Sequence, residues 1–90
     1  MSQLIRIPKR FYIDHYERGL PTPDEVRETK QHIYISSTDP HLESLRADAE
    51  FYADRWGPVY GEREYRWLYI SAKATADAIN KILDTSNNAG

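Results

Sequence analysis

Arginine and aromatic side chains stand next to one another at several points of this sequence, and the pairing indicates what chemistry the chain offers. The chain has 90 residues, and seven of them are tyrosines, two are tryptophans and two are phenylalanines. Arginine and aromatic residues adjoin at positions 10–12, 55–56 and 65–67. A guanidinium group can bind a phosphate or carboxylate through two parallel hydrogen bonds, and it also stacks on rings. This combination predicts binding of a partner or of a planar anionic ligand.

The candidate partner-binding or ligand-binding residues share one property, which is that they belong to these arginine and aromatic clusters or to the segment between them. They are Arg10, Tyr12, Arg55, Trp56, Tyr60, Arg63, Arg66 and Trp67. An alternative is that the rings form the core and the arginines lie flat over them, with their charged ends in water. Both interpretations remain open at the level of sequence.

Three histidines, His15, His32 and His41, are the remaining candidates for a metal or acid–base site, because the chain has no cysteine. Their spacing matches no ligand signature such as HExxH. Asp14 and His15 are adjacent, and adjacent residues on a helix point about 100° apart, so they are poorly placed to hold one ion together. We expect solvated or locally hydrogen-bonded histidines, with no metal and no cofactor. A small metal-dependent hydrolase using the three histidines is the weakest hypothesis.

Nucleophilic catalysis has little support in the sequence. Ser71 and Lys73 are two residues apart on an expected helix, so their side chains do not face each other. The serines match neither a GxSxG nor an SxxK arrangement, and the glycines do not form a phosphate-binding loop. We expect a binding protein rather than an enzyme.

Length and charge exclude several other classes of protein. A chain this short supports one domain, which we place at residues 1–84, followed by a disordered tail at residues 85–90. The net charge of −2 is unfavourable for general nucleic-acid binding. Apolar runs are too short to span a membrane or to form a signal peptide. Together with the absence of cysteine, this favours a cytoplasmic protein.

The N-terminal third predicts a strand, a helix and a second strand. Residues 4–7 form a short apolar segment before Pro8, which restricts the preceding residue to extended conformations. Residues 9–18 have their apolar positions on one side of a helical wheel, and Gly19 suits the left-handed turn that closes a helix. Residues 32–36 alternate in the manner of a strand, with Ile33 and Ile35 facing inward, and we expect them to pair with residues 4–7.

The segment between that helix and the second strand carries a helix-start signal. Thr22 and Glu25 have the spacing of a capping box, and Pro23 lies in the first helical position. We therefore expect a helical start at Pro23. Val26 is the only large apolar residue before Ile33, so the sequence leaves open whether residues 23–31 continue as helix.

Two helices are expected in the C-terminal half. The first begins at Pro40 after an Asp39 cap, extends to Trp56 and is stopped by Gly57 and Pro58. The second runs from Glu62 to about Asp84, with a main apolar stripe of Tyr65, Leu68, Ala72, Ala76, Ile79 and Leu83. A further stripe consists of Trp67, Ile70, Ala74 and Ala78. This second stripe predicts either a homodimer or cover by the first helix and the strands.

These elements predict a small single-domain α+β fold, in which two short strands are packed by a short N-terminal helix, a middle helix and a long C-terminal helix. An all-α bundle is the alternative. The functional hypothesis is a small cytoplasmic protein-binding module of the inhibitor or adaptor type, with aromatic and arginine anchors and self-association. The alternative function is a small anionic-ligand or nucleotide-binding protein with its site at an oligomer interface.

Overall fold

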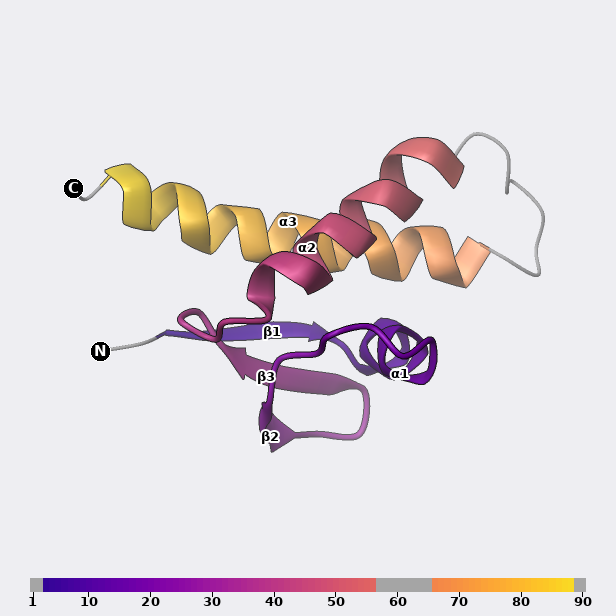
Figure 1. The fold of residues 1–90 in the computed structure, drawn as a ribbon, viewed down its shortest axis with the longest axis horizontal. Coiled ribbons are helices and arrows are strands. Elements are labelled where there is room, and N and C mark those ends of the chain that lie inside the picture. The colour runs from indigo at the N-terminus through magenta and orange to yellow at the C-terminus, as the bar shows by residue number, and fades with distance from the viewer. Residues whose placement is uncertain (1–2, 57–65, 89–90) are drawn as a thin grey trace.

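Three strands and three α-helices form the part of the chain that the computed structural model describes, residues 3–56 and 66–88 (Figure 1). In chain order they are β1 (Leu4–Pro8), α1 (Lys9–Glu17), β2 (Glu25–Glu28), β3 (His32–Ser36), α2 (Leu42–Phe51) and α3 (Arg66–Asn88). A π-helical turn, η1 (Tyr52–Trp56), continues α2. The fold is α+β, as the sequence predicts, and the all-α alternative is wrong.

The sheet is antiparallel with the strand order β1-β3-β2. The predicted pairing of the first strand with residues 32–36 is confirmed, because Ile5 lies opposite Ile35 and Ile7 lies opposite Ile33. All four isoleucines are 2% exposed or less. Since side chains alternate along a strand, the four form one apolar face that the helices cover.

The expected helical start at Pro23 is wrong, and the sheet has three strands instead of two. Residues 25–28 form β2, which pairs with the edge of β3 through Glu25–Ile35 and Glu28–Ile33. The Thr22 hydroxyl donates to the Leu20 carbonyl, at 2.8 Å, instead of capping a helix. A short helix here would have packed little more than Val26, whereas a strand gains backbone hydrogen bonds from β3.

The helices supply the other half of the core. Phe11 of α1, Leu45 and Ala49 of α2, and Ala72 and Ile79 of α3 are each completely buried. The small residues of the main α3 stripe let α2 pack closely across α3, as Figure 1 shows. The main stripe therefore faces the core as predicted.

The second α3 stripe is only partly covered. Ile70 is 57% exposed and Ala74 is also exposed, whereas Trp67 and Ala78 are half-buried. The first helix thus covers one end of this stripe, and the homodimer stays a prediction.

Helix α2 differs from its predicted bounds at both ends. It begins at Leu42 rather than Pro40, because Asp39 is used in the preceding turn: its carboxylate accepts the His41 N–H at 2.8 Å and the Asp24 N–H at 3.0 Å. The helical path continues to Trp56, but with π-helical hydrogen bonding from Tyr52. The predicted stop at Gly57 and Pro58 lies outside the described residues.

Helix α3 continues to Asn88 rather than ending at about Asp84, so it occupies part of the segment 85–90 that the sequence predicts to be disordered. Its predicted start at Glu62, like residues 89–90, lies outside the described residues.

Gly19 closes α1 as predicted, with a φ of 79°. A Cβ atom added there would meet no heavy atom within 4 Å, so only the backbone conformation opposes a side chain. We expect Gly19→Ala to lower the free energy of unfolding by about 1–2 kcal/mol, and Gly19→Asn to lower it less because asparagine adopts this conformation more readily. Urea unfolding measures both. Equal stability of the alanine variant and the wild type would contradict a left-handed turn at this position.

Candidate functional site

Helix α1 presents large side chains to solvent along one side, which we call the α1 face. Ile13 is 42% exposed, Tyr16 is 67% exposed and Leu20, just beyond the helix, is 37% exposed. The α1 face consists of Arg10, Ile13, Tyr16 and Leu20. Arg10, Ile13 and Tyr16 are three residues apart and lie on one side of α1, Leu20 follows the turn at Gly19, and Phe11 and His15 on the opposite side of α1 are completely buried.

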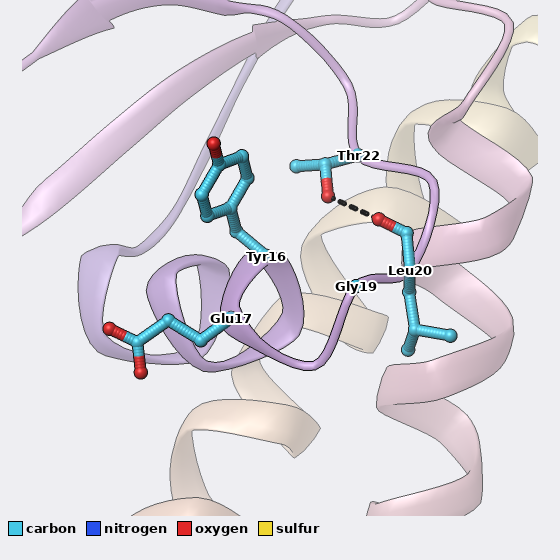
Figure 2. A pocket seen from close by; sticks show the side chains of 5 residues that line it. All are labelled: Tyr16, Glu17, Gly19, Leu20 and Thr22. Atoms are coloured by element: carbon cyan, nitrogen blue, oxygen red, sulfur yellow. Dashed lines mark hydrogen bonds between the residues drawn. The ribbon is translucent and has the colours of Figure 1, made fainter.

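A shallow hollow of about 490 Å³ lies at the C-terminal end of this face. It is lined by Tyr16, Glu17, Gly19, Leu20 and Thr22. In Figure 2, Tyr16 and Leu20 lie on either side of Gly19, and Glu17 extends away from them. Because Gly19 has no side chain, the space between the two apolar groups stays open.

Two of the predicted site residues, Arg10 and Trp67, come together at the other end of α1. The Cζ atom of Arg10 lies 4.2 Å from the centroid of the Trp67 ring. Arg10 is exposed and Trp67 is half-buried, so the pair joins α1 to α3 at the surface. Such cation–π contacts are typical of both core edges and binding surfaces.

The other predicted site residues are not gathered around this pair. Tyr12 is half-buried, and its hydroxyl donates to the Pro23 carbonyl at 2.7 Å. Burial raises the pKa of Tyr12, and the nearby carboxylates of Glu25 and Asp24 raise it further, so the phenol is neutral and used within the chain. Arg66 is exposed at the first residue of α3.

Four predicted site residues remain. The backbone of Arg55 and Trp56 belongs to η1, but their side chains are not among those that the structure describes. Tyr60 and Arg63 lie outside the described residues altogether.

Beneath the α1 face, His15 is buried and charged. Its Nδ1 lies 2.7 Å from Oδ2 of Asp48, and its Nε2 lies 2.8 Å from the Pro21 carbonyl oxygen. A carbonyl oxygen only accepts hydrogen bonds, and so does an ionised carboxylate, so both ring nitrogens must carry a proton. His15 is therefore an imidazolium ion that has no exposed surface.

Asp48 is the shared counter-ion of His15 and Arg18. Both of its oxygens accept from the Arg18 guanidinium, at 2.9 and 2.6 Å, and Arg18 Nε donates to Asp14 at 2.9 Å. Burial raises the pKa of Asp48, but the hydrogen bonds and charges of His15 and Arg18 lower it more, so the net pKa lies below its usual value. The same bond to Asp48 raises the pKa of Arg18. These contacts join the C-terminal end of α1 to α2.

The cluster has little use as an acid–base or metal centre. Both nitrogens of His15 are engaged, so the ring offers no lone pair to a metal or substrate. His32 belongs to β3 and His41 precedes α2. In the described part of the chain, no three His, Asp or Glu side chains come together as a metal site requires. The expectation of a solvated or locally hydrogen-bonded histidine is wrong for His15, which is completely buried and bonded to Asp48, 33 positions away.

Sequence reasoning missed the exposure of Ile13 and Tyr16, because both were taken with Phe11 as one apolar side of the helix. The available signal was the spacing: residues 10, 13 and 16 follow one helical line, and residues 11 and 15 follow another. The partnership of His15 with Asp48 had no sequence signal, since the two are separated by 33 positions.

Comparisons of the chain with protein families, curated proteins and solved structures gave no match. Within residues 3–56 and 66–88, no helix combines the length and apolarity needed to cross a membrane.

The charge cluster makes a prediction about acid stability. Asp48→Asn leaves the His15 cation short of its counter-ion, and we expect a loss of about 2–3 kcal/mol in the free energy of unfolding at pH 7. Because the pKa of Asp48 is depressed in the folded state, its contribution is complete above about pH 4 and is lost as the pH falls through the folded value. The difference between wild type and variant should therefore shrink in stronger acid.

Urea unfolding from pH 7 to pH 2 measures this difference. Asp77→Asn, on the exposed side of α3, makes the same chemical change without a buried partner and should have little effect at any pH. A difference for Asp48→Asn that is constant over the whole range would contradict the assigned ionisation.

Proposed function

We propose that this protein is a small cytoplasmic protein-binding module, of the inhibitor or adaptor type, that contacts its partner through the α1 face and the adjoining Arg10–Trp67 pair. The observation that carries the proposal is the 67% exposure of Tyr16 between two other exposed apolar residues, on a helix whose opposite side is fully buried. Burying these apolar side chains would stabilise a chain with such a small core, yet the fold leaves them exposed.

The residue types fit this role. Tyrosine, tryptophan and arginine are the side chains that most often dominate the energy of protein interfaces. Covering a large apolar side chain contributes about 1.5–3 kcal/mol, so Ile13, Tyr16 and Leu20 together supply enough for a moderate affinity. The bonds of His15 and Arg18 to Asp48 hold α1 before the partner arrives, which reduces the entropy lost on binding.

The partner that fits this surface has a hydrophobic groove, because Ile13 and Tyr16 are exposed on one side of α1 and Leu20 lines the same hollow as Tyr16. A second copy of the chain is included in the proposal: Ile70 and Ala74 on α3 are also exposed, and self-association would cover them. Cytoplasmic location is proposed because the chain lacks the cysteines that stabilise small secreted domains.

Site-specific photo-crosslinking tests the surface directly. With the photoreactive residue p-benzoylphenylalanine at position 16, we expect a discrete adduct in extracts of the source cells, or an adduct of twice the chain mass with purified protein. The matched control places the same residue at Ala47, which is exposed on α2 and belongs neither to the α1 face nor to the exposed Ile70 and Ala74 of α3. Light scattering then measures the solution mass of the purified chain, which distinguishes self-association from capture of another protein. Identical adducts at both positions, or none at either, would contradict the proposal.

A second candidate is binding of an anionic small molecule or nucleotide at an interface between copies of the chain. It is favoured by Arg10, whose guanidinium stacks on Trp67 and has no carboxylate partner within the described residues. Nucleotides at millimolar concentration should then raise the melting temperature, since a ligand at 100 times its Kd stabilises by about 2.7 kcal/mol. Arg10→Ala should abolish the shift and Lys73→Ala should retain it. An unchanged melting temperature of the wild type would rule this candidate out.

A further inference from the structure

The sheet has a second surface that the α1 face does not involve. The helices cover the side of the sheet that carries the buried isoleucines, and the alternating residues of the strands point to the other side. On that side the register places Arg6 of β1 opposite Tyr34 of β3, and Tyr34 opposite Arg27 of β2. A tyrosine on the central strand thus lies between two arginines on the edge strands.

We call this surface the outer sheet face and define it by Arg6, Arg27, His32 and Tyr34. Both arginines are exposed, and Tyr34 and His32 are half-buried. His32 and Tyr34 are two residues apart on β3, so their rings emerge on the same side. The Cζ atom of Arg27 lies 5.4 Å from the centroid of the Tyr34 ring, which brings one cation over the aromatic group.

The charges of this surface are unbalanced. Within the described residues, neither Arg6 nor Arg27 forms an ion pair. The carboxylates of β2 are at register positions of the opposite side: Glu25 pairs with Ile35 and Glu28 with Ile33, both of which face the core. Glu28 is also held by Lys9 Nζ at 2.8 Å. The chain has a net charge of −2, yet the register of the described strands places both arginines and both rings on the outer sheet face, beside Leu4 and Ser36, and the carboxylates of β2 on the other side.

We propose that the outer sheet face binds single-stranded nucleic acid. An unpaired base stacks on the Tyr34 and His32 rings of the central strand, and the phosphates on either side are bound by Arg6 and Arg27. Stacking rings between flanking cations is the chemistry by which proteins hold single strands without reading their sequence. The negative overall charge arises from carboxylates elsewhere on the molecule and does not describe this face.

The open shape of the outer sheet face favours a single strand over the other anionic ligands. A free nucleotide needs a concave site that buries most of its surface, whereas an extended strand can lie across a three-stranded sheet. A duplex keeps its bases stacked inside, so it offers phosphates to the arginines but nothing to the rings. An acidic protein segment would use the arginines in the same way as a duplex.

The test is a titration of labelled single-stranded DNA and RNA of mixed sequence, followed by fluorescence anisotropy at several salt concentrations. For single strands, log K falls with log salt by about 0.7 for each phosphate bound, so two arginines predict a slope of about −1.4. Arg6→Ala and Arg27→Ala should each reduce the slope to about −0.7. The double variant Arg66→Ala/Lys73→Ala removes two charges from α3 and should leave the affinity and slope unchanged.

The ring is tested separately from the charges. Tyr34→Phe keeps the stacking surface and should bind as the wild type does. Tyr34→Leu keeps an apolar residue on the strand but removes the ring, and its affinity should fall about tenfold. Circular dichroism and urea unfolding confirm that both variants fold.

Several results would overturn the proposal. One is the absence of binding by the wild type, and another is equal affinity for a single strand, the corresponding duplex and polyglutamate, which indicates an unspecific or protein-type anion site. A third is an unchanged affinity in Tyr34→Leu. None of these results bears on crosslinking at position 16, so the α1 face and the outer sheet face are tested independently.

Discussion

The buried ion cluster of His15, Asp48 and Arg18 determines where the C-terminal end of α1 lies. His15 donates to Asp48 of α2 and to the carbonyl of Pro21, so one side chain holds α1, α2 and the turn that leads towards β2. A buried cation without these two acceptors would cost several kcal/mol, so the three segments are stable only together. The direction of α1, and with it the exposure of Tyr16, follows from this constraint.

The elements of the fold form one core and leave two candidate binding surfaces exposed. The isoleucines of β1 and β3 meet Phe11 and the alanine-rich side of α3, and the small side chains of α3 allow the helices to lie close to the sheet. This core uses one side of β1, β3 and the three α-helices, whereas the residues of β2 are exposed. The α1 face and the outer sheet face are the opposite sides of α1 and of the sheet, so the same alternation that forms the core also creates the two candidate binding surfaces.

The candidate site was partly predictable. The pairing of arginine with aromatic residues predicts Arg10 and Trp67 as site residues, and these two side chains meet in space because both residue types are suited to stacking. Tyr12 is the same kind of residue, but its hydroxyl is satisfied by Pro23 inside the chain. Composition cannot separate these cases, since burial depends on which side of α1 faces α2. The sequence did not single out Tyr16 and Arg27 for the same reason: the exposure of Tyr16 and the position of Arg27 opposite Tyr34 are set by the fold.

The sequence by itself determined the strands at residues 4–7 and 32–36, the helix closed by Gly19 and the core side of α3, because each depends on local periodicity and backbone preference. Tertiary structure decided what depends on distant partners. β2 is a strand because the edge of β3 offers hydrogen bonds that outweigh the local helix signal at Thr22 and Pro23. His15 is a buried cation because folding brings it to Asp48, 33 positions away, and no local pattern records that contact.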